Sequence, residues 1–365
     1  MKTTEVLVIG GGPAGLSAAL EAASRGSQVT LVDSDLQLGG QLIKQTHKFF
    51  GSEDERAGTR GYKIGELLFK ELEGLKDHID VHVNTTVLGY YKEDGVVSLS
   101  RGEEDYFRIK PDRIVMSTGA MERLIPFPKN DLPGVYGAGA VQTLMNVYGV
   151  TPGKRVLMIG AGNIGLIVSY QLMQAGVDVA AVVEFMPKIG GYWVHAAKIR
   201  RFGVPILLRH TIVEALGEDV VSGAVIQAVG DKGLEGEPIR IDCDIICLAV
   251  GLTPTAELLW QAGCDMQFVP ELCGYVPRRD AHMRTSQPHI WVAGDAAGIE
   301  EASSAMVEGR LAGLGAARSL GHVKDSDYDA GLASYWQRLS HLRAGEVGEK
   351  IRSGLEKCSC DAWEV

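Results

Sequence analysis

The sequence predicts an α/β protein made of two similar doubly wound domains, with one domain inserted into the other. Three observations support this fold class. The chain has 365 residues, which is enough for two or three domains. It contains 46 glycines, against roughly 26 expected at the usual ~7%, without collagen-like periodicity or enrichment of its 13 prolines. The segment 6–41 recurs about 150 positions later, at 156–192. The glycines therefore indicate tight turns or backbone that approaches a ligand closely.

Charge and cysteine content exclude several classes of protein. The 36 Lys and Arg residues against 46 Asp and Glu give a formal net charge of −10, without a basic tract. This balance argues against binding to nucleic acid or to an anionic membrane. Six cysteines suit a reducing compartment rather than a disulfide scaffold. The apolar run at 6–10 is too short for a signal peptide, and no stretch is long enough for a membrane span. We therefore expect a cytoplasmic protein without a membrane span.

The first copy of the repeat has the order strand, loop, helix, strand. Residues 6–10, VLVIG, predict a buried parallel strand, and glycines follow at the spacing G-x-G-x-x-G. The first glycine allows a tight turn, the second lets the backbone approach a pyrophosphate, and the third lets the helix pack on the strand. The helix N-terminus offers free N–H groups and a positive dipole end to the phosphates. A second strand ends at Asp33, 18 residues after Gly15, where a carboxylate can accept hydrogen bonds from a ribose.

The second copy repeats each of these features. Gly160, Gly162 and Gly165 follow the strand VLMIG, and Glu184 ends the next strand 19 residues after Gly165. One glycine motif is a weak signal, because glycine-rich turns also open ordinary βαβ units. Its recurrence, with strand, helix, strand and acid in the same order, favours two dinucleotide sites. Glu184 favours NAD(H) over NADP(H), because a carboxylate repels a 2′-phosphate. The alternative is that this domain binds another adenine nucleotide or no nicotinamide.

A third segment distinguishes the two sites. Residues 285–298 predict a turn, a short apolar strand and then Gly294-Asp295, and residues 303–316 predict a helix of small residues. This segment resembles the second flavin motif of flavoproteins with two dinucleotide-binding domains. The resemblance implies FAD in the first site, with Asp295 on the ribityl chain and the helix N-terminus at the pyrimidine edge of the flavin. The alternative is a plain turn with Asp295 as a helix cap.

Two segments resemble the turns at which such flavoproteins leave and re-enter the FAD domain: 112–120, ending in Thr118-Gly119-Ala120, and 244–254. Both domains are then expected to be Rossmann-like, with three ββα/αβ layers. The expected boundaries are 1–120 for the first part of the FAD-binding domain, 121–150 for a crossing segment, 151–254 for the NAD(P)-binding domain, 255–320 for the second part of the FAD-binding domain and 321–365 for a helical tail. In the tail we expect a helix over residues 328–342, docked on its own domain or on another subunit.

The resemblance implies contacts from both nucleotide motifs. The expected FAD-binding residues are Gly10, Gly12, Pro13, Ala14, Gly15, Asp33, Gly40, Gln41, Thr118, Gly119, Gly294, Asp295 and Met306. The expected NAD-binding residues are Gly160, Gly162, Asn163, Ile164, Gly165, Glu184 and Gly251. Lys44, His47 and Glu308 are candidates to approach the flavin ring, although such residues are more often packing or surface residues. No catalytic acid or base is assigned, because hydride transfer between nicotinamide and flavin requires none.

The redox-active cysteine pairs of many such flavoproteins have no counterpart here. Relatives place them in stretches that correspond to residues 39–51 or 145–156, and neither stretch contains a cysteine. Cys243 and Cys247 lie in a predicted strand and are expected to be buried thiols. We therefore expect no disulfide reductase activity.

Residues 118–144 carry a more specific resemblance. The elements T-G-A-x-E-R, P-F-P, L-P-G-V and A-G-A are similar to a segment of the flavoprotein subunits of multi-subunit amine dehydrogenases and oxidases. That group, within the pyridine nucleotide-disulfide oxidoreductase superfamily, includes subunits of sarcosine oxidase, opine oxidase, hydrogen cyanide synthase and dye-linked proline dehydrogenase. The resemblance implies an FAD-dependent, NAD(P)H-linked oxidoreductase subunit. It would pass electrons to a partner dehydrogenase or iron–sulfur subunit of an amine, opine or hydroxy-acid dehydrogenase complex.

The C-terminal motif Cys358-Ser359-Cys360 departs from that group. Several such subunits continue into a cysteine-rich [2Fe–2S] domain that begins with C-x-C, whereas this sequence stops shortly after Cys360. A cluster normally needs four cysteines. Three interpretations stay open: a solvated tail without a role, a flexible dithiol, or partial iron–sulfur ligands completed by a partner subunit. No other metal site is expected.

Three alternative functions also stay open. The chain could be a standalone NADH:acceptor reductase, a flavoprotein that oxidises an amine or hydroxy acid at its own flavin, or a non-catalytic subunit that holds nucleotides. Turnover of the isolated chain with NADH and an artificial acceptor excludes the last of these.

Overall fold

The computed structural model describes residues 1–49, 51–102 and 104–360. The chain divides into two compact units: Met1–Met121 with Thr253–Val365, and Glu122–Leu252. The second unit is therefore inserted into the first along the chain. Within the described ranges, no helix is long and apolar enough to cross a membrane.

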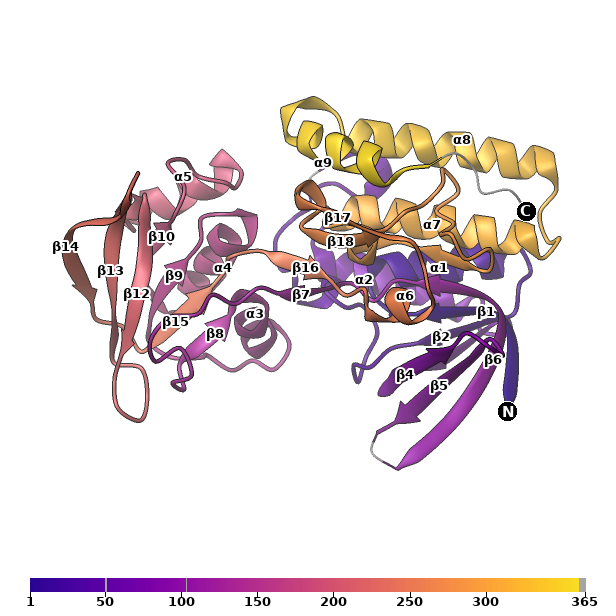
Figure 1. Ribbon diagram of the computed structural model, residues 1–365, viewed down its shortest axis with the longest axis horizontal. Coiled ribbons are helices and arrows are strands. Elements are labelled where there is room, and N and C mark those ends of the chain that lie inside the picture. The colour runs from indigo at the N-terminus through magenta and orange to yellow at the C-terminus, as the bar shows by residue number, and fades with distance from the viewer. Residues whose placement is uncertain (50, 103, 361–365) are drawn as a thin grey trace. The chain divides into compact units, whose positions relative to one another are not determined.

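The chain passes between the units in two short strands. These are β7 (Ala120–Glu122) and β16 (Leu252–Pro254), which pair with each other (Figure 1). Of residues 121–150, expected as a crossing segment, all but Met121 fall in the second unit. The reason is that β8 (Val135–Gly137), within this segment, forms parallel hydrogen bonds with β15 (Ile245–Leu248).

The first unit is built on a seven-stranded sheet in the order β3-β2-β1-β6-β5-β4, with β19 also paired to β6. The mutually parallel strands are β1 (Lys2–Ile9), β2 (Val29–Val32), β3 (Ile79–His82), β6 (Asp105–Met116) and β19 (Ile290–Val292). An antiparallel meander of β4 (Thr85–Tyr91) and β5 (Val96–Arg101) continues the sheet from β6. Val6, Leu7 and Val8 of β1 are fully buried. A parallel strand covered on both faces is expected to be apolar throughout, as this one is.

Helices and a small hairpin complete this unit. The helices are α1 (Pro13–Ser24), α2 (Gly61–Glu73), α6 (Glu257–Gln261), α7 (Ala302–Ser319), α8 (Asp325–Leu342) and α9 (Gly345–Cys358). The hairpin is β17 (Met266–Val269) with β18 (Gly274–Pro277), and short 3₁₀ turns lie at Leu42–Lys44, Glu53–Glu55, Pro270–Leu272 and Gly294–Ala296.

Glycines bring α1 and α7 into close contact. A Cβ atom at Gly309 would lie 2.1 Å from the carbonyl oxygen of Ala14. One turn further on, a Cβ atom at Gly313 would lie 2.4 Å from that of Ala18. Only glycine fits at these two positions, which explains why the sequence of α7 is rich in small residues.

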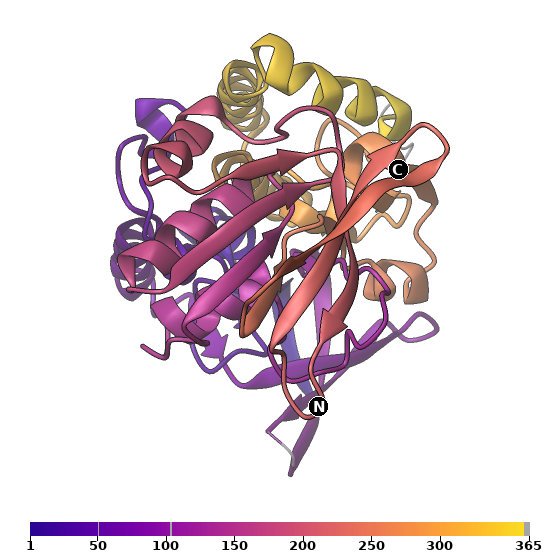
Figure 2. The ribbon, with the colours of Figure 1, turned by 90° about the vertical axis from the view of Figure 1, so that its left-hand side faces the viewer.

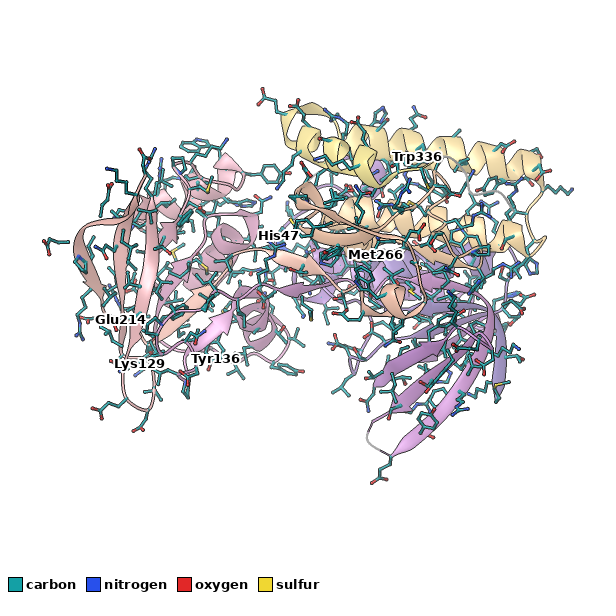
Figure 3. The ribbon with its side chains drawn as sticks, in the orientation of Figure 1. His47, Lys129, Tyr136, Glu214, Met266 and Trp336 are labelled. Carbon is teal, nitrogen blue, oxygen red and sulfur yellow. The ribbon has the colours of Figure 1, made fainter. Side chains whose placement is uncertain are left out.

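The C-terminal helices belong to the first unit. Figure 1 shows α8 and α9 in yellow, with α8 beside α7. The helix α8 starts three residues before the expected position and ends at Leu342 as expected, whereas α9 has no counterpart among the sequence predictions. Leu339 is fully buried. Trp336 is labelled on α8 in Figure 3, and its indole N–H donates to the carbonyl of Ala281 at 2.9 Å. The tail therefore packs on its own unit.

The second unit has three layers (Figure 2). Its central sheet is parallel, in the order β11-β10-β9-β15-β8, and the three strands not yet described are β9 (Arg155–Ile159), β10 (Asp178–Glu184) and β11 (Ile206–Leu208). One apolar core lies between this sheet and α3 (Ala138–Asn146), α4 (Asn163–Gln174) and α5 (Trp193–Arg201). A second core lies between it and the antiparallel meander of β12 (His210–Leu216), β13 (Gly223–Gly230) and β14 (Gly233–Ile241). The predicted fold class, two Rossmann-like α/β domains, is confirmed.

Candidate dinucleotide sites

The first glycine loop connects β1 to α1, and its shape depends on glycine. Gly10 has φ +102°, and its N–H donates to the carbonyl of Val32 at 2.8 Å. A Cβ atom at Gly10 would lie 2.2 Å from the carbonyl oxygen of Ser117, and one at Gly15 would lie 1.7 Å from that of Gly10. No other residue fits these two positions without moving the strands, so the first and third glycines hold the loop against the sheet.

The second glycine has a different role. Gly12 is the N-cap of α1 at φ −76°, Pro13 is the first residue of the helix, and no side chain caps it. The nearest atom to a Cβ placed at Gly12 is the Cα of Gly40, at 4.0 Å. The backbone at the start of α1 is therefore open, with uncapped N–H groups and the positive end of the helix dipole. We call this open helix N-terminus, with the acid at the end of the next strand, a cradle, and its N–H groups suit a pyrophosphate.

The acid at the end of β2 lies against the same loop. Asp33 accepts the N–H of Gly11 on Oδ2 at 2.5 Å and the N–H of Asp35 on Oδ1 at 2.7 Å. Burial raises the pKa of Asp33, while these two backbone hydrogen bonds oppose the rise. Each carboxylate oxygen keeps a further lone pair, so the group can still accept from a ribose diol.

The second unit reproduces this loop closely. Gly160 has φ +108°, and a Cβ atom there would lie 2.2 Å from the carbonyl oxygen of Ala249. A Cβ atom at Gly165 would lie 2.1 Å from the carbonyl oxygen of Gly160, whereas one at Gly162 would meet nothing within 4 Å. The same three roles therefore recur at the same spacing.

The acid of the second unit repeats the geometry of Asp33. Glu184 accepts the N–H of Ala161 on Oε2 at 2.7 Å and that of Met186 on Oε1 at 2.8 Å. Asn163 takes the position of Pro13, and its Oδ1 accepts the N–H of Tyr192 at 2.7 Å. This bond fastens the loop after β10 to the start of α4.

The two remaining expected residues of the second unit differ in their surroundings. Ile164 in the first turn of α4 is 37% exposed, so its side chain can line a bound nucleotide. Gly251 has φ +116°, and its carbonyl accepts the N–H of Arg123 at 2.9 Å. It lies at the end of the inserted unit, just before β16.

The Gly294–Asp295 turn adds to the first site alone. Gly294 has φ +70°, and a Cβ atom there would lie 2.8 Å from the Cβ of Ala14, so the turn lies against the first turn of α1. Asp295 is half-buried, and the desolvation of its carboxyl group raises its pKa to about 7. Met306 is buried on α7. The resemblance to a flavin motif therefore corresponds to residues that the fold brings together.

The segment after the first Gly-Gly contains the tentative flavin residues. Gln41 is exposed beside Gly40. Lys44 is half-buried, and its charge is one of the smaller effects that oppose the burial-driven rise in the pKa of Asp33. The half-buried His47, labelled in Figure 3, stacks on Phe49 with ring centroids 6.3 Å apart.

The side chains of Thr118 and Glu308 both form polar contacts within the protein. Thr118 Oγ1 donates to the carbonyl of Thr255 at 2.7 Å, and the N–H of Thr255 donates to the carbonyl of Gly119 at 3.0 Å, which ties the two ends of the first unit together. Glu308 is buried, accepts the N–H of Gly294 at 3.0 Å and is ion-paired with Arg343. Glu308 therefore holds the Gly294 turn, and its approach to the flavin ring stays a prediction.

Sequence reasoning also missed the role of Glu122. Its carboxylate accepts the N–H of Gly139 at 2.7 Å and that of Ala140 at 3.3 Å, at the start of α3. A Cβ atom at Gly137 would lie 2.2 Å from this carboxylate. In the segment 118–144, the glutamate of the element E-R therefore caps the helix that begins in the element G-A-G-A. The small residues of G-A-G-A, which leave room for the carboxylate, were the sequence signal from which this contact could have been predicted.

The cysteines are mostly interior. Burial raises the pKa of Cys243, which lies just before β15, to about 11, and it also raises the pKa of Cys247 on that strand. Both are buried thiols, as predicted. Cys358 is fully buried at the end of α9, and its carbonyl accepts the N–H of Arg279 at 3.1 Å. The interpretation of a solvated tail is therefore wrong for Cys358, while Cys360 is half-buried. Among residues 1–49, 51–102 and 104–360, no three metal-binding side chains form a group that could hold an ion.

Comparison with known proteins agrees with these features. The chain is 29% identical over 333 residues to hydrogen cyanide synthase subunit HcnB of Pseudomonas protegens, covering 84% of this chain and 69% of that one. It is 31% identical over 337 residues to an opine oxidase subunit from Agrobacterium tumefaciens, covering 87% and 66%. The alpha subunit of sarcosine oxidase from Corynebacterium sp. is 29% identical, but this chain spans only 33% of it.

Solved structures show the same fold. L-proline dehydrogenase from P. horikoshii superposes with a TM-score of 0.71 at 24% identity, over 92% of this chain and 58% of that one. Thioredoxin reductase from T. acidophilum gives a TM-score of 0.71 at 22% identity, over 88% and 99%. The family model of pyridine nucleotide-disulphide oxidoreductases matches residues 4–309. The chain therefore belongs to the pyridine nucleotide-disulphide oxidoreductase family, whose members are flavin-dependent oxidoreductases.

Proposed function

We propose that the chain binds FAD in the first unit and NAD(H) in the second, and passes electrons between these cofactors and a partner subunit or carrier. The observation that carries this proposal is the duplicated cradle, in which an open helix N-terminus lies beside a carboxylate in both units. Of the described residues, those of the first unit alone add the half-buried Asp295 turn. This asymmetry supports FAD in the first cradle and nicotinamide in the second.

The chain's own residues divide the work of holding each cofactor. In the first unit, Gly12 leaves room for the pyrophosphate, Asp33 would accept from the adenosine ribose, and Asp295 would accept from the ribityl chain. In the second unit, Gly162 and Glu184 would do the same for NAD(H). When bound, FAD supplies a centre that accepts a hydride and can pass electrons on singly.

The preference for NADH rests on the occupied carboxylate of Glu184. Both of its oxygens accept backbone N–H groups at 2.7 and 2.8 Å, so the group is fixed in place at the end of β10. A 2′-phosphate in that position would face a fixed negative charge, whereas a 2′-hydroxyl can donate to it.

Electron transfer through a cysteine pair is not part of the proposal. The first 242 residues contain no cysteine, and Cys243 and Cys247 are buried thiols with raised pKa values. A thiol that stays protonated is a poor nucleophile. Electrons would instead leave to another subunit.

The partner subunit is proposed from the relatives. The three curated relatives described above are named as subunits, of a hydrogen cyanide synthase, an opine oxidase and a sarcosine oxidase. We propose that this chain likewise serves in a heteromeric amine, opine or hydroxy-acid dehydrogenase. A standalone NADH:acceptor reductase is the second candidate, because the chain contains both cradles by itself.

Anaerobic titration of the FAD-loaded chain with NADH tests the proposal. We expect the visible flavin absorbance to bleach with NADH, and less readily with NADPH. FAD that binds but does not bleach would refute the nicotinamide half, and failure to bind FAD would refute the whole. Steady-state turnover with an artificial acceptor, compared with and without co-purified subunits, then distinguishes the standalone reductase from a complex subunit.

A further inference from the structure

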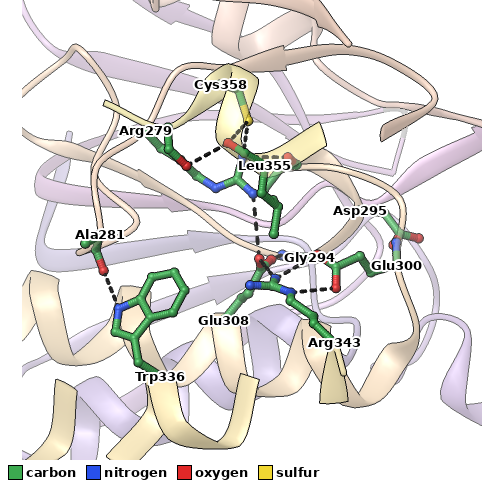
Figure 4. Close-up of polar contacts among 12 residues, drawn as sticks. Arg279, Ala281, Gly294, Asp295, Glu300, Glu308, Trp336, Arg343, Leu355 and Cys358 are labelled. Carbon is green, nitrogen blue, oxygen red and sulfur yellow. Dashed lines mark hydrogen bonds and ion pairs between the residues drawn. The ribbon is translucent and has the colours of Figure 1, made fainter. Parts of the chain in front are cut away.

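Two buried arginines hold the turn that carries Asp295, residues 294–300. Arg279 and Arg343 are each 5% exposed. Arg279 Nη1 donates to the carbonyl of Ala297, in the middle of the turn, at 2.7 Å. Arg343 forms a fork on the carboxylate of Glu300, at the end of the turn, with Nε–Oε2 and Nη2–Oε1 distances of 2.9 and 2.7 Å (Figure 4).

Glu308 connects these contacts to the start of the turn. Its Oε1 lies 2.6 Å from Arg343 Nη2 and 3.7 Å from Arg279 Nη2. Its Oε2 accepts the N–H of Gly294 at 3.0 Å. The turn is thus held at its first residue, in its middle and at its last residue by one network of charges, whose arginine and glutamate side chains are only 3–8% exposed (Figure 4).

Arg343 reaches this network from outside the nucleotide-binding motifs. It is the C-cap of α8, whereas the family model ends at residue 309. Helix α8 is fastened to the same unit independently, since the Tyr335 hydroxyl donates to Glu21 Oε2 on α1 at 2.7 Å. Helix α8 therefore has a contact with the unit that does not involve the turn.

The charge balance of the network depends on Arg343. Glu308 is buried and the Glu300 side chain is 8% exposed, and both are ion-paired with Arg343. Arg279 is the second buried cation, and the half-buried Asp295 lies in the same turn. Removal of one partner from a buried ion pair leaves a charge without compensation, which is strongly unfavourable. Without Arg343, Glu300 would lose its bidentate partner and Glu308 would keep only the longer contact with Arg279, so the turn would carry excess negative charge.

We propose that Arg343 is a positioning residue of the FAD site: it fixes the turn 294–300 and offsets the acids around it, so that the site holds FAD, and holds reduced FAD more tightly than it could without this cation. This inference rests on the proposed binding of FAD in the first unit. Reduced FAD carries additional negative charge, so its binding depends more on the lost cation.

The test compares Arg343→Met with Tyr335→Phe in the full-length chain. Tyr335→Phe is the matched control, because it removes one buried hydrogen bond of α8 and leaves the turn untouched. The measurements are the Kd of FAD by equilibrium dialysis and the midpoint potential of the bound flavin against a reference dye. Far-UV circular dichroism verifies folding.

For Arg343→Met we expect a Kd of oxidised FAD about tenfold higher than for the unchanged protein. The Kd of reduced FAD should rise by a factor about ten times larger than the Kd of oxidised FAD does. This difference corresponds to a fall of about 30 mV in the two-electron midpoint potential of the bound flavin. Tyr335→Phe should change the Kd by no more than about twofold and leave the potential unchanged. Arg343→Lys keeps the charge without the fork, so it should restore the potential and only part of the affinity.

Two results would overturn the inference. One is a Kd and a potential of Arg343→Met equal to those of the unchanged protein. The other is an equal shift in Tyr335→Phe, which would assign the effect to helix docking. If Arg343→Met does not fold, Arg343→Lys decides: unchanged FAD affinity in that variant refutes the role of the fork. Failure of the unchanged protein to bind FAD would instead refute the proposed function.

Discussion

Replacement of Gly12 by alanine separates the role of this glycine in binding from any role in folding. Gly12 has φ −76° and ψ −169°, which an alanine adopts without strain. A Cβ atom there has no neighbour closer than 4.0 Å. The substitution therefore changes the open space in front of the helix N-terminus and little else. This is the space that the proposal assigns to the FAD pyrophosphate.

The two expected effects have opposite signs. Alanine lowers the conformational entropy of the unfolded chain, so the free energy of unfolding of the apoprotein should stay the same or rise by about 0.4–1 kcal/mol. Loss of one charge-assisted hydrogen bond between a phosphate and an N–H group costs about 1.5–3 kcal/mol, a roughly 10- to 150-fold rise in the Kd of FAD. Urea denaturation measures the first quantity, and equilibrium dialysis with FAD measures the second.

The second copy of the repeat supplies the matched control. Gly162 is also an N-cap, at φ −74°, and a Cβ atom there meets nothing within 4 Å. Gly162→Ala should bind FAD normally but bind NADH weakly, so that its flavin no longer bleaches at the NADH concentrations that suffice for the unchanged protein. Normal FAD binding by Gly12→Ala, or weak FAD binding by both variants, would refute the assignment of one cofactor to each cradle.

Three further predictions concern stability. Gly309→Ala places a Cβ atom 2.1 Å from the carbonyl oxygen of Ala14 and should lower the free energy of unfolding by about 1–3 kcal/mol. Gly65→Ala, whose nearest contact is 3.8 Å, should raise it by roughly 0.5–1 kcal/mol, and destabilisation by both would refute the packing argument. Glu122→Ala removes the cap of α3 and should cost about 1–2 kcal/mol in urea unfolding, so an unchanged midpoint would contradict that role. Burial raises the pKa of Asp295 from its usual 3.8 to about 7, so the native apoprotein binds more protons than the unfolded chain in this window, and stability should fall as pH rises through it, by at most about 4 kcal/mol. Asp295→Asn should flatten that pH dependence, and an equal slope in both proteins would refute it.

The nucleotide cradles could be predicted from the sequence because their geometry is local. A residue at φ +102° or +108° that also touches a neighbouring strand must be glycine, so Gly10 and Gly160 had to appear in any sequence with this loop. The acids at 33 and 184 end strands next to those loops, at a distance along the chain set by one helix. Such constraints act within about 30 residues and therefore repeat visibly.

The helix-to-helix contacts were predicted only in part. The sequence indicated that α7 is rich in small residues, but it could not show that Gly309 and Gly313 face α1. Similarly, T-G-A-x-E-R was visible as a motif, whereas the capping of α3 by Glu122 depends on a turn that returns 17 residues later. Each of these contacts joins two segments whose separation along the chain is not fixed by a repeating pattern, so the sequence does not indicate which residues meet.

The sequence by itself determined the α/β fold class, the repeat and the position of both cradles, because short-range backbone geometry permits few residue types there. Only the tertiary structure showed that α8 brings Arg343 onto the turn of Asp295, that Glu308 of α7 binds the first residue of that turn, and that Cys358 is buried. The physical reason is that a buried charge needs only an opposite charge at the right point in space. Its partner can come from any part of the chain, so no pattern in the sequence records the pair.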